Sequence, residues 1–149
     1  MEKTQKPEEI LLKKAGFFST PRRIRMLEIF RERAMAQNEL PKHLTAEDLY
    51  EILNAEGLSA SLGTIYRALG AFAEKGILRQ LITDRSRASY EWADRDHHDH
   101  LICTGCRKVL EFRDEVLEAS QRRIAQTYGF ELTDHVTVLY GKCAECAKK

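Results

Sequence analysis

The sequence predicts an α+β protein in two parts, a helix-rich domain over residues 1–93 and a smaller α/β domain over residues 94–149. Two observations support this division. Apolar residues recur at helical spacing through most of the first part, which ends in two β-like runs, whereas the second part alternates short strands with one helix. All four cysteines follow residue 102, and of the five histidines only His43 lies in the first part.

Composition narrows the function classes. The chain has 149 residues, 24 Lys+Arg and 23 Asp+Glu, a net charge of +1 that excludes a uniformly basic nucleic-acid binder. A hydrophobic share of 43% excludes a wholly disordered chain. No apolar run reaches the roughly 18 residues of a membrane helix. The polar N-terminus does not resemble a signal peptide, so we expect a cytoplasmic protein with no membrane partner, whose cysteines serve metal or redox chemistry.

The first two helices are predicted from their ends. Residues 8–14 form a short helix that Gly16 terminates, and Thr20 followed by Pro21 is a typical helix start. The buried stripe of this second helix comprises Ile24, Leu27 and Phe30. Residues 31–42 contain Asn38 and Pro41 and are expected to form a loop.

Two further helices follow. Thr45 and Asp48 indicate a capping box at the start of the third helix, which Gly57 ends. Its buried face comprises Leu49, Ile52 and Leu53. Ser61 caps the fourth helix, which Gly76 ends. Its buried positions are Leu62, Ile65, Leu69 and Phe72.

A β-hairpin completes the first domain. Residues 77–83 and 88–93 are β-like, and residues 84–87 form a basic tip between them. Helices followed by a hairpin indicate a winged helix-turn-helix, which places one helix in the DNA major groove. Tyr66 and Arg67 lie off the buried face of that helix and offer a phenol and a guanidinium to DNA.

A basic run allows two interpretations. Between Ile10 and Leu27 there are five positive residues and no acid: Lys13, Lys14, Arg22, Arg23 and Arg25. These side chains form either a solvated helix face or a contact surface for phosphate, and the run alone does not decide between them.

The cysteines form two CxxC pairs. Cys103 and Cys106 make the first, and Cys143 and Cys146 the second. Four thiolates at this spacing enclose one Zn²⁺ tetrahedrally, and a closed shell of this kind is structural. A redox dithiol is the alternative, but it needs only one CxxC in a thioredoxin-like setting.

Residues 97–100 read His-His-Asp-His. On a strand, His98 and His100 point to one face and His97 and Asp99 to the other, so one strand can serve two metal sites. A solvated polar linker is the alternative. Candidate partners in such sites are His43, Glu91, Glu111, Glu118 and His135. Mixed imidazole and carboxylate donors suit Fe²⁺, Mn²⁺, Zn²⁺ or Co²⁺.

The rest of the second domain is predicted to be strand, helix and strand. Residues 108–112 form a strand, and Asp114 caps a helix that runs through Tyr128 before Gly129. The inner stripe of this helix comprises Leu117, Ile124 and Tyr128. Residues 130–140 form another strand. Exposed strand edges favour pairing with a second copy, and a dimer matches a two-fold DNA site.

Several segments of this chain resemble the ferric uptake regulator family. They are Thr45-Ala46-Glu47-Asp48-Leu49-Tyr50, Gly63-Thr64-Ile65-Tyr66-Arg67, and the stretch His97-His98-Asp99-His100-Leu101-Ile102-Cys103 with Cys106, followed by Val109–Phe112 and Tyr140-Gly141-x-Cys143. The resemblance covers residues 10–146. It implies a dimeric, metal-activated repressor that binds palindromic operator DNA, with an N-terminal winged helix and a C-terminal dimerisation domain; a tetramer is also compatible.

The resemblance also implies roles for individual residues. The structural zinc ligands are Cys103, Cys106, Cys143 and Cys146. The regulatory metal ligands at the hinge are His43, Glu91, His98, His100 and Glu111. The ligands of a second site are His97, Asp99, Glu118 and His135. The DNA contacts are Lys13, Lys14, Arg23, Ser61, Thr64, Tyr66 and Arg67.

The subfamily follows from two carboxylates. Glu91 and Glu111 are Glu rather than Asp, as in the iron-sensing branch of the family, so Fe²⁺ is the expected co-repressor; zinc- and manganese-responsive relatives are the alternative. The chain departs from the family pattern at Phe18, where members carry Lys or Arg for a minor-groove contact, and Lys13 or Lys14 is the expected substitute.

Rival functions come from two other classes. A zinc hydrolase or deaminase needs an open metal position and a general base, for which Glu111 or Glu118 is the candidate. The sequence lacks both HExxH and the HxE…PCxxC signature, so we expect no enzyme. A zinc-ribbon interaction module without DNA binding is the other rival.

Overall fold

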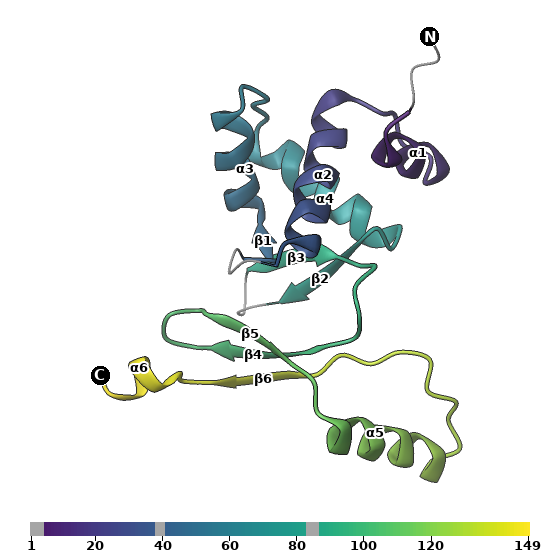
Figure 1. Cartoon of the computed structure of the whole chain (residues 1–149), viewed down its shortest axis with the longest axis vertical. Coiled ribbons are helices and arrows are strands. Elements are labelled where there is room, and N and C mark those ends of the chain that lie inside the picture. The colour runs from purple at the N-terminus through teal and green to yellow at the C-terminus, as the bar shows by residue number, and fades with distance from the viewer. Residues whose placement is uncertain (1–4, 38–40, 83–86) are drawn as a thin grey trace. The chain divides into compact units, whose positions relative to one another are not determined.

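The computed structural model describes residues 5–37, 41–82 and 87–149, which form two compact units, Met1–Arg95 and Asp96–Lys149 (Figure 1). None of the helices within these described ranges is long and apolar enough to cross a membrane.

Four helices make up most of the first unit: α1 (Pro7–Lys14), α2 (Pro21–Met35), α3 (Ala46–Ala55) and α4 (Leu62–Glu74). The predicted caps are confirmed. The side chains of Thr20, Thr45 and Ser61 accept hydrogen bonds from backbone amides in the first turns of α2, α3 and α4. Thr45 and Asp48 form the full capping box, which satisfies amides that the start of a helix leaves unpaired.

The loop predicted over residues 31–42 is wrong in its first part, because α2 continues to Met35. Arg31, Glu32 and Arg33 are good helix formers, and two of them also make ion pairs. Arg31 contacts the buried Glu8 of α1 at 2.6 Å, and Glu32 contacts Arg25, about two turns earlier in α2, at 2.8 Å. Asn38 lies outside the described residues.

A three-stranded sheet packs against these helices. It comprises β1 (Leu44–Thr45), β2 (Leu78–Ile82) and β3 (Ala88–Trp92), in the order β1-β3-β2, and all pairs are antiparallel. The predicted hairpin is confirmed as β2 and β3, although residues 84–86 of its basic tip lie outside the described residues. The two-residue strand β1 was not predicted, because so short a segment carries no periodicity.

The helices and the sheet enclose one apolar core. Phe30, Leu49, Leu53, Leu69 and Phe72 are fully buried in it, with Leu12, Leu27 and Ile65. The predicted burial of Leu62 is wrong, since 37% of this residue is exposed. Leu62 is the first residue of α4, where no preceding turn of the helix covers its side chain.

The second unit has a three-stranded sheet of β4 (Asp99–Cys103), β5 (Val109–Phe112) and β6 (Val138–Gly141), with α5 (Glu115–Thr127) and a short α6 (Ala144–Ala147). The strand order is β5-β4-β6, antiparallel between β4 and β5 and parallel between β4 and β6. The side chain of Asp114 caps α5, as predicted.

Two predictions for this unit need correction. Of the expected strand 130–140, only residues 138–140 lie in a strand, β6; the Thr137 carbonyl still accepts a hydrogen bond from the His100 amide of β4 at 3.0 Å, but residues 130–136 belong to no strand. The expected inner stripe of α5 is not buried within the unit, since Ile124 is exposed and Tyr128 is 75% exposed. A helical stripe predicts an apolar face but not whether the same chain covers it.

Candidate metal centres and nucleic-acid interface

Four cysteines converge at one end of the second unit. Cys103 ends β4, Cys106 lies in the turn after it, and Cys143 and Cys146 come from the segment after β6. Their sulfur atoms all lie within 4.8 Å of one another. Thus the parallel pairing of β4 with β6 brings together two CxxC pairs that are far apart in the sequence.

The electrostatics of this cluster call for a cation. The backbone amides of Cys143 and Cys106 donate to the Cys103 sulfur at 3.3 and 3.5 Å and lower the pKa of that thiol to about 5. Hydrogen bonds with the sulfurs of Cys143, Cys103 and Cys106 raise the pKa of the Cys146 thiol to about 12, and burial and the charge of Cys103 add to this rise. Four sulfur atoms this close together match the tetrahedral thiolate shell of a structural Zn²⁺.

Two residues of this turn were missed by the sequence analysis. A Cβ atom at Gly105 would lie 2.8 Å from the Cys146 sulfur, so only glycine leaves room for the cluster. Arg107 has a φ of 64°, a left-handed conformation that usually favours glycine, and its amide bonds to the Cys103 carbonyl at 2.9 Å. The central glycine of Cys-Thr-Gly-Cys was the available sequence signal for the first of these.

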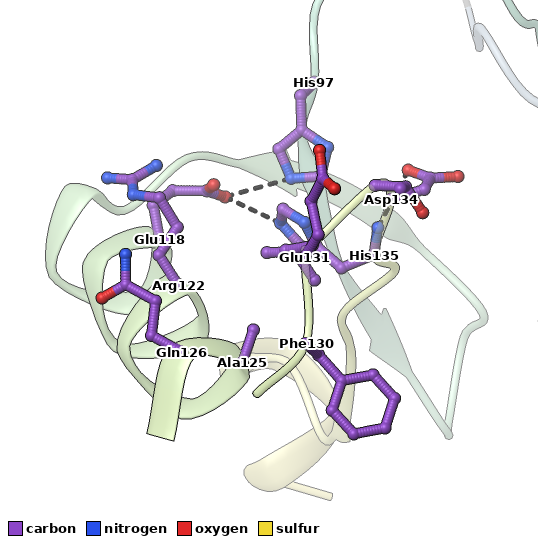
Figure 2. A pocket seen from close by; sticks show the side chains of 11 residues that line it. His97, Glu118, Arg122, Ala125, Gln126, Phe130, Glu131, Asp134 and His135 are labelled. Atoms are coloured by element: carbon purple, nitrogen blue, oxygen red, sulfur yellow. Dashed lines mark hydrogen bonds and ion pairs between the residues drawn. The ribbon is translucent and has the colours of Figure 1, made fainter. Parts of the chain in front are cut away.

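A second cluster joins β4 to α5 (Figure 2). Glu118 of α5 points toward two imidazoles, with its Oε1 3.0 Å from His97 Nε2 and 3.2 Å from His135 Nε2. With Asp99 of β4, these residues place their ligand atoms within 4.8 Å of one another. Burial disfavours the charged form of Glu118, but the His135 hydrogen bond and the charges of His135 and His97 outweigh it and lower the pKa.

Asp99 tests whether this cluster fits a metal. It is 0% exposed, and neither carboxylate oxygen has a hydrogen-bond partner in the described part of the chain. His97 Nε2 lies 3.4 Å from Oδ1. A buried carboxylate without donors is costly unless a cation neutralises it. The cluster therefore fits a divalent ion held by two imidazoles and two carboxylates, and an open cavity of about 540 Å³ adjoins it, lined also by Arg122 and Gln126 (Figure 2).

The other face of β4 carries a separate group of donors. The rings of His98 and His100 are 4.8 Å apart, and His98 Nε2 lies 3.7 Å from Glu111 Oε1 of β5. The Asp96 carbonyl accepts a 2.7 Å hydrogen bond from His98 Nδ1, so Nε2 carries the lone pair that a metal needs. The alternation predicted for residues 97–100 is therefore observed, although the strand itself begins only at Asp99.

The first unit holds its own pair of donors. His43 Nε2 lies 3.2 Å from Glu91 Oε2, and the carboxylate of Glu91 is almost fully buried. Arg95 also donates to Glu91 Oε2. The sequence analysis missed Arg95, because nothing in its spacing distinguishes it from a surface arginine.

Around the N-terminal half of α4, the predicted DNA contacts Ser61, Tyr66 and Arg67 are exposed, and Thr64 is half-buried. Ser61 caps the helix and its hydroxyl lies 2.9 Å from that of Thr64, while Arg67 donates to the same Thr64 hydroxyl at 3.4 Å. Tyr66 donates a 2.6 Å hydrogen bond to Glu47 of α3, a partner that the sequence analysis missed. This face presents hydroxyl groups and a guanidinium, the groups that bind base edges and phosphates.

The basic run divides in two. Lys13 and Lys14 are exposed on the last turn of α1, and Arg23 donates to the Phe18 carbonyl at 3.2 Å. Arg25, by contrast, contacts three carboxylates, those of Glu28, Glu32 and Glu56. Its charge is therefore neutralised within the unit, so Arg25 does not belong to a surface for phosphate.

Comparison with known proteins gives consistent results. A family model described as "Ferric uptake regulator family" matches residues 14–140. The chain is 43% identical over 137 residues to the ferric uptake regulation protein of Bordetella parapertussis, with 92% of this chain and 94% of that protein covered.

Solved structures of ferric uptake regulators are also similar to this chain. A Vibrio cholerae ferric uptake regulator, described with rearranged DNA-binding domains, matches with a TM-score of 0.79 and 37% identity, over 91% of this chain and 98% of the other. A Francisella tularensis ferric uptake regulator with iron matches with a TM-score of 0.76 and 32% identity, over 89% of this chain and 96% of the other.

Proposed function

The chain belongs to the ferric uptake regulator family, and from that premise we propose that it is a metal-responsive transcriptional repressor. It binds palindromic operator DNA as a homodimer when a divalent cation occupies the regulatory site. It acts in the cytoplasm and catalyses no reaction. The observation that carries the proposal is that each unit holds a histidine next to a glutamate, His43 with Glu91 in the first unit and His98 with Glu111 in the second. We call each pair, with its neighbouring donors, a half-site.

The regulatory site is proposed to draw ligands from both units. His43 and Glu91 supply two donors in the first unit, and His98, His100 and Glu111 supply three in the second. Two donors leave a divalent cation with most of its shell unfilled, whereas five approach the number that Fe²⁺ or Mn²⁺ takes. An ion shared by both half-sites restricts the hinge, and it favours the DNA-competent arrangement only by its higher affinity for that arrangement.

Fe²⁺ is the proposed co-repressor. Both carboxylates of the site are Glu, as in the iron-sensing branch, and the similar Francisella protein was solved with iron. The alternative is a zinc- or manganese-responsive regulator, because the same imidazole and carboxylate donors accept Mn²⁺, Zn²⁺ and Co²⁺.

The four cysteines are proposed to hold a structural Zn²⁺, and the cluster of Glu118 to hold a second ion. The closed thiolate shell leaves no position for substrate. The second cluster has four protein donors, so it too lacks the arrangement of three ligands and a water that a zinc hydrolase uses. These donor sets support a regulator over an enzyme.

DNA binding is assigned to the exposed face of α4 together with basic residues before it. The residues are Lys13, Lys14, Arg23, Ser61, Thr64, Tyr66 and Arg67. In a winged helix-turn-helix the corresponding helix enters the major groove, and flanking basic residues contact the backbone.

Dimerisation is assigned to the second unit. Ten of its large apolar residues are exposed: Leu101, Leu110, Val116, Ile124, Tyr128, Phe130, Leu132, Val136, Leu139 and Tyr140. So many exposed apolar side chains on a unit of 54 residues mark an interaction surface, and a second copy with the same surface covers it symmetrically. Two such dimers can also pair into a tetramer.

The test is fluorescence anisotropy of a labelled palindromic duplex during titration with Fe²⁺, Mn²⁺ or Zn²⁺, after loosely bound metal has been removed. Metal-dependent binding is expected for the wild-type chain and for Glu115→Ala, which removes an exposed carboxylate outside the site. His43→Ala and Glu111→Ala are expected to remain folded dimers that no longer respond to metal. A retained response in either variant would contradict the regulatory site, and no binding by the wild type with any metal would contradict the function.

A further inference from the structure

One aromatic residue of the first unit is exposed for no structural reason. Phe18 lies between α1 and α2 and is 85% exposed, whereas the adjacent Phe17 packs edge-on against Phe72 of α4, with ring centroids 5.4 Å apart. A large apolar side chain left in water forgoes the free energy of burial, so Phe18 contributes little to the stability of this unit.

The backbone around Phe18 is firmly held. Its carbonyl accepts hydrogen bonds from the Thr20 amide at 3.1 Å and from Arg23 Nη1 at 3.2 Å. On the other side, the amide of Phe17 donates to the Leu12 carbonyl at 2.8 Å. The ring of Phe18 is therefore presented outward from a fixed segment, which lowers the entropic cost of using it to bind a partner.

The surroundings of Phe18 are basic. It lines a hollow of about 650 Å³ between the α1–α2 connection and the exposed side of α4. Arg22, Arg23 and Arg67 line the same hollow, and none of its lining residues is acidic. These arginines donate to neutral oxygen atoms, Arg22 to Ser59, Arg23 to Phe18 and Arg67 to Thr64. An apolar ring among uncompensated arginines complements a polyanion that also has apolar surface.

We propose that Phe18 makes an apolar contact with the operator DNA, packing on deoxyribose and base edges beside the base pairs that α4 reads, while the arginines contact phosphates. This inference rests on the proposed function, because it assigns a further contact to the same DNA-binding surface. Apolar side chains at the edge of DNA-binding domains pack against or between bases in the minor groove. Such a contact increases the affinity for DNA without releasing counterions from the phosphates.

Salt dependence distinguishes this contact from an ionic one. Each phosphate neutralised by Lys or Arg adds close to one to the slope of log affinity against log salt, whereas an apolar contact adds nothing to that slope. Removing Phe18 should therefore lower the affinity by the same factor at every salt concentration and leave the slope unchanged. A lysine in its place should make the slope steeper.

The experiment measures duplex binding by anisotropy in saturating metal at several salt concentrations. Phe18→Ala is expected to bind about tenfold more weakly at every salt concentration, with the wild-type slope. Phe18→Lys is expected to steepen the slope by about one. Met35→Ala removes another strongly exposed apolar side chain, at the far end of α2, and is expected to match the wild type.

Two results would overturn the inference: wild-type affinity in Phe18→Ala, which would show that the ring adds nothing to DNA affinity, or a shallower salt slope in that variant. Both require that the wild type binds the duplex in response to metal. If the wild type does not, the proposed function fails first, so the two failures are distinguishable.

Discussion

The hydroxyl of Tyr66 on α4 donates a 2.6 Å hydrogen bond to the carboxylate of Glu47 on α3. The bond raises the pKa of Tyr66 and lowers that of Glu47, as expected when a phenol stabilises a neighbouring carboxylate. A negative charge is thus held against the face of α4 to which DNA binding is assigned. Because DNA is a polyanion, this carboxylate opposes binding.

Glu47→Gln is therefore expected to raise operator affinity, by roughly threefold at low salt and less as salt screens the charge. Anisotropy at two salt concentrations measures the effect. Glu74→Gln removes an exposed carboxylate at the opposite end of α4 and should change affinity little. Weaker binding by Glu47→Gln would show that this carboxylate contacts a base, for instance the amino group of cytosine.

Gly105→Ala is expected to disrupt the cysteine cluster. The added methyl would lie 2.8 Å from the Cys146 sulfur, and overpacking of this kind costs about 1–3 kcal/mol. The zinc content of the protein and its melting temperature should both fall. The control is Gly141→Ala on β6, where a Cβ meets nothing within 4 Å. Equal zinc retention by the two variants would refute the crowding at Gly105.

Much of this cluster was predictable from the sequence, since two CxxC motifs are typical of four sulfurs that gather at one metal site. The crowding at Gly105 was not, because it arises only when the parallel pairing of β4 and β6 brings Cys146 over the first turn. Caps and glycine stops predicted the helices well, since Thr20, Thr45 and Ser61 act within one turn. The burial of Leu62 and the stripe of α5 were predicted wrongly, because covering a face depends on tertiary or subunit contacts.

Arg25 is expected to support stability and not DNA binding. It makes two hydrogen bonds to Glu56, at 2.7 and 2.8 Å, and contacts Glu28 and Glu32 as well. The Arg25 hydrogen bond lowers the pKa of Glu56 below that of the unfolded chain, so this stabilisation is present at neutral pH and is lost as the pH falls through the carboxylate range. Arg25→Gln should cost about 1 kcal/mol at pH 7.

Urea unfolding of wild type and variant at pH 7 and at about pH 3.5 tests this, since the difference should shrink at the lower pH. Arg33→Gln is the control: Arg33 donates to the Pro41 carbonyl, which does not titrate, so its effect should be the same at both pH values. A pH-independent cost for Arg25→Gln would contradict the charge network.

Arg95 is expected to compete with the regulatory metal. Its guanidinium donates to the same Glu91 oxygen that lies 3.2 Å from His43 Nε2, so it occupies a ligand atom and adds positive charge beside the ion. Arg95→Ala should therefore tighten Mn²⁺ binding roughly tenfold, measured by the metal concentration at half-maximal operator binding. Arg122→Ala, at the second cluster, should leave that midpoint unchanged. A weaker response in Arg95→Ala would assign Arg95 the role of holding Glu91 in position.

Asp99 provides a test in which the sign of the effect depends on metal. Without an ion, no hydrogen-bond donor among the described residues satisfies its fully buried carboxylate, which therefore destabilises the second unit. Asp99→Asn removes that charge, so the variant should be more stable than the wild type, by about 1–3 kcal/mol, once loosely bound metal is removed. With Mn²⁺ added, the wild type gains stability by mass action and the variant, which has lost a ligand, gains much less. The order of the two melting temperatures should therefore reverse with metal, and the same order in both conditions would exclude an ion at this cluster. Glu131→Gln, an exposed carboxylate lining the adjoining cavity, should follow the wild type in both conditions.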